Sequence, residues 1–395
     1  MPKLTRRHFL YSAGLAAAHA SVPEFLACSA PRARIASGGG SDKRRLVVVQ
    51  LSGGNDGLNT LAPTGSAAYR ELRPTLGLKP AQTIRIDGDH GWHPALTGLA
   101  ALYDEGLVGV YRGVGYPNPQ HSHFRSLDIW HTATANGQSS GTTGWLGRYL
   151  DAYCAGEPAH HVVDFNATSS LAVQGERASG FSMGALVPNS SLLDRLPEAG
   201  GTLGDDAYVA KVLTDARSST RYLIDHIKQR RAGSDYPRTP LGKQLRDVAN
   251  LVLSDADTKV YYTSMGGFDT HDRQGRRHER LLGQYGDAMR YFVEDLRQNG
   301  ALADTLILTF SEFGRRAYEN GSGGTDHGAG NLAWVIGGSL RERGLLNDGD
   351  ALSRLDEGNV AARVDFRGLY ATILERWLGV PHEPIVGRRD LLGFV

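Results

Sequence analysis

The 395-residue sequence contains only two cysteines, Cys28 and Cys154, which excludes a framework of several disulfides. Beyond the N-terminal region, no stretch has the roughly 20 consecutive apolar residues of a membrane-spanning helix. Neither sign of charge is in excess, because 43 Lys and Arg stand against 42 Asp and Glu. This balance gives no electrostatic argument for binding nucleic acid or an anionic membrane surface. We therefore predict a globular protein with no nucleic-acid partner and no transmembrane span.

The N-terminal region has the features of a targeting signal. Thr5-Arg6-Arg7-His8-Phe9-Leu10 resembles the twin-arginine export motif, and an Ala-rich apolar stretch with a plausible cleavage site follows at 13–20. An amphipathic helix of the mature protein is the alternative, but Ser, Gly and Pro dominate 31–41. We predict a twin-arginine signal peptide and linker at 1–36, a domain at 37–395, and the twin-arginine translocon as export partner. The expected location is the periplasm or cell envelope, with Cys28 as a potential lipid anchor.

The remaining sequence alternates between apolar strands and amphipathic helices. The uninterrupted apolar run 46–51 predicts a central parallel strand that is buried on both faces. Further strands are predicted at 107–111, 161–165, 171–173, 258–263, 305–310 and 332–336. Helices are predicted at 67–72, 94–105, 123–131, 143–156, 205–231, 241–254, 275–298 and 366–378. This order is typical of a single α/β domain with a mostly parallel sheet.

Acidic residues and histidines follow several of these strands. Because open α/β sheets bind ligands at the carboxyl ends of their strands, we expect these side chains to meet at one edge. Carboxylate and imidazole together indicate a divalent metal site for Zn, Mn, Mg or Ca. The predicted ligands are Asp56, Asp269, His271, Glu312, Asp326 and His327.

Other polar residues near these strands have plainer interpretations. Ser122 lies where a helix would begin, which is the position of a helix N-cap. Arg315 is predicted to bind the substrate anion, with a solvated side chain as the alternative. His93, His121 and His123 could be core or surface histidines, and we prefer this interpretation for His93 and His121.

Several motifs together carry a family resemblance over nearly the whole chain. They are the arginine pair, Gly53-Gly54-Asn55-Asp56-Gly57-Leu58, His93-Pro94-Ala95-Leu96, Ser122-His123-Phe124, Gly144-Trp145-Leu146-Gly147-Arg148, Gly267-Phe268-Asp269-Thr270-His271, Ser311-Glu312-Phe313-Gly314-Arg315 and Gly323-Gly324-Thr325-Asp326-His327-Gly328. The chain resembles the alkaline phosphatase-like superfamily and, within it, the domain-of-unknown-function 1501 family. The resemblance implies a three-layer α/β sandwich, two metal ions and a Ser, Thr or modified Cys nucleophile.

The resemblance also assigns roles to individual residues. It makes Ser122 the candidate nucleophile, with Thr60, close behind Asp56, as the rival. It makes Asp56 the acidic ligand after the first strand and places Asp269, His271 and His327 around one metal. Glu312 takes the place of an aspartate that a histidine usually follows, but here Phe313 follows. The second metal site is therefore expected to be richer in oxygen, or absent.

Two functions of different classes follow from these expectations. The first is an exported metal-dependent hydrolase of phosphate or sulfate esters, with a small anionic ester as its substrate. The second is a non-catalytic metal-binding envelope protein that retains the fold. A sulfatase of the usual type is disfavoured because no Cys-x-Pro-x-Arg or Ser-x-Pro-x-Arg segment is present.

Overall fold

The computed structural model describes residues 43–134, 142–183, 207–230, 232–233, 235–348, 351–353 and 355–395, without the side chains of 207–213. Lys43–Val395 forms one compact unit. The twin-arginine pair, Cys28 and the predicted boundary after residue 36 lie outside the described residues.

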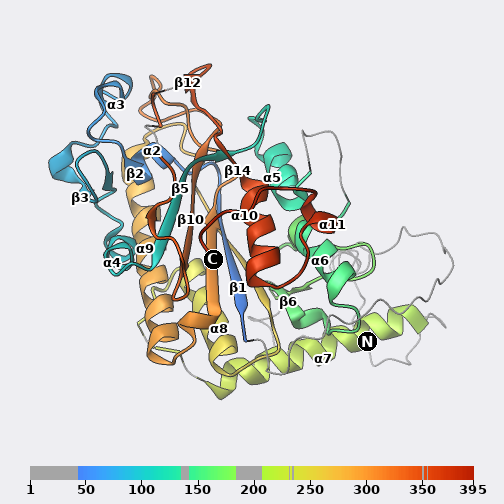
Figure 1. Ribbon diagram of the computed structural model, residues 1–395. Coiled ribbons are helices and arrows are strands. Elements are labelled where there is room, and N and C mark those ends of the chain that lie inside the picture. Colours follow the sequence, from blue (N-terminus) through green and yellow to red (C-terminus); the bar gives the residue numbers. More distant parts are fainter. Residues whose placement is uncertain are drawn as a thin grey trace, which may run out of the picture. The chain divides into compact units, whose positions relative to one another are not determined.

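A nine-stranded sheet forms the centre of this unit (Figure 1). Its order is β11-β5-β10-β9-β1-β8-β6-β7, and β14 also pairs with β5. The strands are β1 (Arg45–Ser52), β5 (Val108–Gly115), β6 (Val162–Asp164), β7 (Phe181–Ser182), β8 (Val260–Gly266), β9 (Thr305–Phe310), β10 (Asn331–Gly337), β11 (Gly344–Leu345) and β14 (Val364–Asp365). Among the described strands of this sheet, β10 is the one that runs antiparallel to its neighbours.

Helices cover both faces of the sheet, as Figure 1 shows. One face carries α4 (Thr97–Asp104), α7 (Ala207–Gln229), α8 (Pro240–Leu253) and α9 (Gln274–Gln298); the other carries α5 (His123–Thr132), α6 (Trp145–Tyr153), α10 (Phe366–Thr372) and α11 (Glu383–Val386). Alternate residues of β1 enter the two cores: Val47 and Val49 pack toward α9, and Val48 packs toward α10. The predicted three-layer α/β fold with a mostly parallel sheet is confirmed.

Most predicted elements coincide with observed ones, and the exceptions have physical reasons. Residues 171–173 form a 3₁₀ turn (Leu171–Val173) instead of a strand, and the last long helix ends in a π-helical segment (Ile373–Trp377). The short helix α3 (Ala67–Leu72) lies where it was predicted. Other short elements were not predicted, because they are too short to show a periodicity in the sequence. They are α2 (Gly57–Thr60), β2 (Leu61–Ala62), β3 (Ile84–Arg85), β4 (Gly91–Trp92), β12 (Leu355–Asp356) and β13 (Asn359–Val360).

The direction of β10 determines where the functional loops meet. β9 ends at Phe310 and β10 returns from Asn331, which pairs with Val114 near the end of β5. The loop 311–330 therefore lies at the same edge as the carboxyl ends of β1, β5 and β8. Segments far apart in the sequence are thus brought together at this edge.

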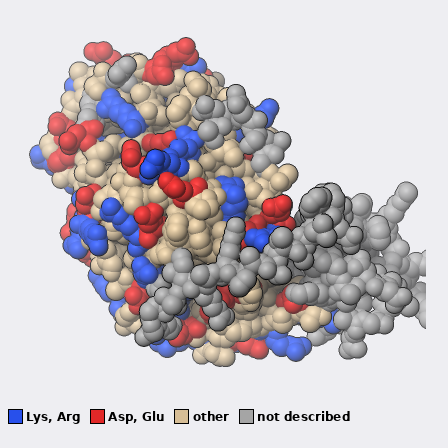
Figure 2. All heavy atoms as spheres, turned by 45° about the vertical axis from the view of Figure 1, so that its right-hand side comes forward, with Lys and Arg blue, Asp and Glu red and all other residues tan. Residues whose placement is uncertain are grey.

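The surface of the described residues has mixed charge. Lys and Arg alternate with Asp and Glu over the face seen in Figure 2, without a broad patch of either sign. None of the helices in the described part of the chain is long and apolar enough to cross a membrane.

Candidate metal centre

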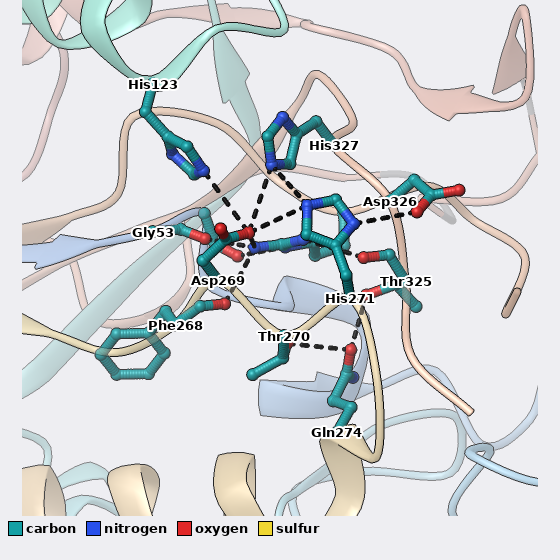
Figure 3. A network of polar contacts seen from close by, with 12 residues as sticks. Gly53, His123, Phe268, Asp269, Thr270, His271, Gln274, Thr325, Asp326 and His327 are labelled. Atoms are coloured by element: carbon teal, nitrogen blue, oxygen red, sulfur yellow. Dashed lines mark hydrogen bonds and ion pairs between the residues drawn. The ribbon is translucent and has the colours of Figure 1, made fainter. Parts of the chain in front are cut away.

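Four side chains point to a common place at this edge of the sheet (Figure 3). The Oδ1 atom of Asp269 lies 3.0 Å from Nε2 of His271 and 3.2 Å from Nε2 of His327. Nε2 of His123 lies 3.4 Å from the same oxygen. The two Nε2 atoms of His271 and His327 are 2.9 Å apart. Ligands about 2.0–2.1 Å from a tetrahedral zinc ion would be roughly 3.3 Å from each other, which is close to these spacings.

The other nitrogen of each imidazole fixes its tautomer. The Nδ1 contacts are His123 with Oε1 of Glu312 at 2.8 Å, His271 with Oδ1 of Asp326 at 3.0 Å, and His327 with the carbonyl oxygen of His121 at 2.7 Å. A carbonyl or carboxylate oxygen accepts, so each Nδ1 donates and each neutral ring keeps a lone pair on Nε2. Three lone pairs and a carboxylate then face one another. They repel unless a cation lies between them.

Carboxylates and carbonyls behind the histidines are the usual support of a metal site. Nε2 of His123 is buried and has no hydrogen-bond partner in the described structure. Three imidazoles and one carboxylate suit zinc or a similar transition metal better than Ca or Mg, which prefer oxygen ligands. The donor set therefore fits the metal that the sequence predicts. Within the described residues, His123, Asp269 and His327 are the one group of three whose ligand atoms approach closely enough to hold an ion.

Helix α5 directs His123 into the cluster. His123, Ser126 and Trp130 share one face, with the spacing i, i+3 and i+7. The hydroxyl of Ser126 and the indole N–H of Trp130 both donate to the backbone carbonyl of Glu312, at 2.9 and 2.8 Å. The Glu312 carboxylate also accepts from the N–H of Gly53 at 2.8 Å. Glu312 thus fixes α5 against the ends of β1 and β9.

Glycines allow the ligand loops to approach each other. Gly53 has φ +114°, and a Cβ there would lie 2.4 Å from the backbone nitrogen of Asp269. A Cβ at Gly324 would lie 2.3 Å from the carbonyl carbon of His271. Side chains at these two positions would separate the loops that carry the ligands.

Arg315 fastens these loops from inside. Its buried guanidinium donates to the carbonyls of Gly53, Gly54, Phe268 and Thr325, and to Oδ1 of Asp269 at 2.8 Å. Burial raises the pKa of the Asp269 carboxyl, but the hydrogen bond from Arg315 lowers it, and the net pKa lies well below the ordinary value. Asp269 is therefore a carboxylate at neutral pH, although its side chain is 46% exposed.

The histidines differ in their electrostatic surroundings. The hydrogen bond to Glu312 raises the pKa of His123, whereas burial lowers the pKa of His327. The hydrogen bond from His271 lowers the pKa of Asp326. Glu312 and Asp326, which the sequence predicts as metal ligands, contact the Nδ1 atoms of His123 and His271. Both carboxylates therefore lie behind the imidazoles and not among the Nε2 atoms of the cluster.

Asp56 lies in a separate buried network. Its carboxylate pairs with Arg73 at 2.5 Å, and both side chains are fully buried. Burial raises the pKa of Asp56, but the charge of Arg73 and the hydrogen bonds from Arg73 and Gln274 together lower it by more, so the net pKa is below the ordinary value. Asp56 is thus not brought to the cluster, although its Oδ1 has no partner within the described structure.

Gln274 connects Asp56 to the ligand loops, and Figure 3 shows Gln274 beside Thr270. Its amide donates to Oδ2 of Asp56, and its Oε1 accepts from the hydroxyls of Thr270 at 3.1 Å and Thr325 at 2.6 Å. Thr270 lies between two ligands in the sequence, and Thr325 precedes Asp326. One buried side chain therefore holds both loops.

The two predicted nucleophiles lie in different surroundings. Ser122 occupies the N-cap position of α5 as predicted, but its exposed hydroxyl makes no capping hydrogen bond. Thr60 is buried, and its hydroxyl contacts Asn55 and the carbonyl oxygen of Asp56. Of the two, Ser122 is the one exposed to solvent.

Phe313 occupies the space beside the imidazoles. Its ring centroid lies 4.9 Å from that of His123 and 4.8 Å from that of His327. It cannot act as a ligand, and neither Asp56 nor Glu312 extends a second group of ligands around it. The described residues therefore assemble one candidate metal position.

His123 is the residue that sequence reasoning missed. A lone histidine on a helix is more often a core or surface residue than a ligand. The signal that could have found it is the spacing of His123, Ser126 and Trp130, which gives α5 a polar and aromatic face directed away from solvent.

Comparisons with known proteins give a family and weak structural similarities. No curated protein matches the chain. Solved structures with a related arrangement include the lipoteichoic acid synthase LtaP from Listeria monocytogenes, with 10% identity, TM-score 0.43 and coverage of 89% of this chain and 76% of that one. The PsFucS1 sulfatase from Pseudoalteromonas sp. has 12% identity, TM-score 0.40 and coverage of 88% and 71%. The periplasmic domain of EcEptC from Escherichia coli, in complex with Zn, has 11% identity, TM-score 0.36 and coverage of 76% and 74%.

Similarities of this strength transfer neither substrate nor mechanism. A family model, in contrast, matches residues 109–390, which is more than half of the chain and includes His123, Asp269, His271 and His327. The chain therefore belongs to the family described as protein of unknown function (DUF1501), as its motifs predicted.

Proposed function

We propose that this protein is an exported metal-dependent hydrolase of phosphate or sulfate esters. The observation that carries the proposal is the convergence of three Nε2 lone pairs on the Asp269 carboxylate. His123, Asp269, His271 and His327 would hold the ion. The paired Arg6 and Arg7 support export through the twin-arginine translocon to the periplasm or cell envelope.

When bound there, a zinc-type ion supplies Lewis acidity to an ester oxygen and lowers the pKa of a hydroxyl or water. The chain's own residues orient the site: Glu312 and Asp326 keep the Nδ1 protons on their imidazoles. Asp269 leaves the site open to solvent, so a small anionic ester can reach it. The reaction adds water across an O–P or O–S bond and releases an alcohol and phosphate or sulfate.

Ser122 is our proposal for the nucleophile. Its hydroxyl is exposed, is not used as a cap and precedes His123 by one residue. The free N–H groups at the start of α5 would also favour an anionic ester. Arg315 would act on that anion through its charge, because its N–H groups already bind backbone carbonyls and Asp269.

The test begins with protein purified after native export and never exposed to chelator. We expect stoichiometric divalent metal by elemental analysis and turnover of an aryl phosphate or aryl sulfate that chelation abolishes. Ser122→Ala should lose kcat while metal content and thermal stability stay unchanged, because the hydroxyl acts in the covalent step. Wild-type protein without metal would contradict the whole proposal; a fully active Ser122→Ala variant would contradict only the role of Ser122.

A second function, a non-catalytic metal-binding envelope protein, is favoured by two observations. Four protein ligands are typical of closed structural zinc sites, whereas catalytic sites keep an open position. In addition, Phe313 fills space where a further imidazole would be expected. Metal that raises Tm, in a protein that turns over no phosphate or sulfate ester, would establish this second function.

A further inference from the structure

A polar cavity lies near the metal centre, at the same edge of the sheet. Its volume is about 350 Å³, and its lining comes from β1, β8, α5, α8 and the loop after β6. Gln50 and Ser264 are paired in the sheet, each two residues before the end of its strand. Gly53 directly follows β1, and Asp269 follows β8 three residues after its end. At about 3.3 Å per residue, the cavity begins on the order of 10 Å from the cluster.

Apart from Ala167, the described residues of the lining have uncharged side chains that can form hydrogen bonds. They include Gln50, His131, Asn166, Thr168, Gln244 and Ser264. Burial lowers the pKa of His131 to about 4, so this ring is neutral at pH 7. Phosphate and sulfate groups require cations or arrays of N–H donors, which these side chains do not supply. The cavity is therefore unsuited to the charged part of an ester.

The polar groups are held in place and leave capacity for a ligand. The Oε1 atom of Gln50 accepts from Nε2 of His131 at 2.9 Å, and Oδ1 of Asn166 accepts from the Ser264 hydroxyl at 2.5 Å. The amide N–H of Gln244 donates to the carbonyl of Phe165 at 3.0 Å, and the Thr168 hydroxyl lies on an exposed side chain at the lining. Fixed amides and hydroxyls with free capacity match the alternating donors and acceptors of a polyhydroxylated ligand.

We propose that this cavity binds the neutral, polyhydroxylated part of the ester, so that the substrate is a phosphate or sulfate ester of a sugar. The inference rests on the proposed function and adds the class of the alcohol. A volume of about 350 Å³ is within the usual range of pockets for small molecules and accommodates one sugar ring. Its ester group would extend toward the cluster along the ends of β1 and β8.

Direct binding tests the cavity without relying on catalysis. Saturation-transfer NMR with neutral methyl glycosides should show binding to wild-type protein. Thr168→Trp should abolish the signal, because Thr168 is exposed at the lining and an indole would fill the cavity without disturbing the core. Asn166→Ala should weaken it at least 10-fold by removing an amide. Ser218→Trp, an exposed position on α7, is the matched control and should bind as wild type does.

Kinetics provide the second arm of the test. Thr168→Trp should lower kcat/KM for a sugar phosphate or sulfate at least 10-fold relative to an aryl ester, and Ser218→Trp should leave this ratio unchanged. Aryl ester hydrolysis in a wild type that binds no glycoside would overturn the sugar subsite and leave the hydrolase proposal intact. The protein could also bind glycosides, lose this binding in Thr168→Trp and hydrolyse no ester. That outcome would overturn the proposed hydrolase activity and support the sugar-binding cavity. Equal binding of glycerol and glycosides would overturn the assignment to a sugar.

Discussion

The His123 imidazole is fixed on three sides. Glu312 binds its Nδ1, Phe313 packs against its ring, and Nε2 faces Asp269. A buried ring nitrogen without a donor is costly, and a metal ion would remove this cost. For this reason we expect His123 to bind the metal directly, as we expect of His271 and His327.

Replacing His123 by alanine should weaken metal binding by more than about 100-fold, since even residues that only support ligands contribute 10–100-fold. Competition with a fluorescent zinc chelator measures the change. His121→Ala is the matched control, because the structure uses only the backbone carbonyl of His121. Equal metal affinity in both variants would remove His123 from the site.

Gln274 should matter for stability as well as for metal binding. Gln274→Leu would leave the Thr270 and Thr325 hydroxyls and the Asp56 carboxylate without their buried partner. At about 1 kcal/mol or more for each lost hydrogen bond, we expect unfolding free energy to fall by about 3 kcal/mol in urea titrations. Gln298→Leu, at the exposed end of the same helix, should change it by less than about 0.5 kcal/mol. Equal effects of the two substitutions would contradict the connecting role of Gln274.

At the scale of elements, the site depends on sharp turns at the ends of β1 and β8. Gly53 has a positive φ and lies against the backbone of Asp269. Neither a relaxed backbone nor a new rotamer can make room for a side chain between two main chains. The turn therefore admits glycine alone.

Gly53→Ala should lower the free energy of unfolding by more than about 2 kcal/mol through backbone strain and separation of the loops. It should also weaken metal binding, because Asp269 would move. Gly275→Ala is the control within a helix: no atom lies within 4 Å of the Cβ that it adds, so it should stabilise α9 by roughly 0.5–1 kcal/mol. Chemical denaturation of the two variants measures whether the free energy of unfolding falls in Gly53→Ala and rises in Gly275→Ala.

Across the whole molecule, buried histidines couple stability to pH. Burial lowers the pKa of His278 to about 3 and that of His161 to about 4. The unfolded chain binds protons at these residues near pH 6.5, while the folded chain does not. The contribution of these neutral histidines to the free energy of unfolding is therefore fully present above about pH 6.5 and is lost as the pH falls. Burial raises the pKa of Asp164 to about 6, which acts in the opposite direction.

Because the histidine and aspartate effects oppose each other, a variant must isolate one of them. In metal-free protein, His278→Gln should make the slope of unfolding free energy against pH shallower by about 1.4 kcal/mol per pH unit between pH 4 and 6, the value for one proton. Urea titrations at several pH values measure this slope. An unchanged slope in His278→Gln would mean that this ring is protonated in the folded protein.

Local sequence patterns were enough to predict the layers of the fold and the loops that carry the site. The apolar run 46–51 must be buried on both faces, and the helical periodicity of α8 and α9 requires a sheet to cover. Strand–loop boundaries likewise placed Asp269, His271 and His327 at one edge. The family followed from motifs that the family model confirms over residues 109–390.

Which side chains face one another depends on how the elements pack in three dimensions. The antiparallel direction of β10 and the docking of α5 on Glu312 bring His123 into the cluster. Arg73, 17 residues from Asp56, pairs with it and keeps that carboxylate out of the cluster. Periodicity describes which face of an element is buried, but partners in space depend on strand order and loop packing, which no local pattern encodes. For this reason the metal loops could be predicted, whereas the set of ligands could not.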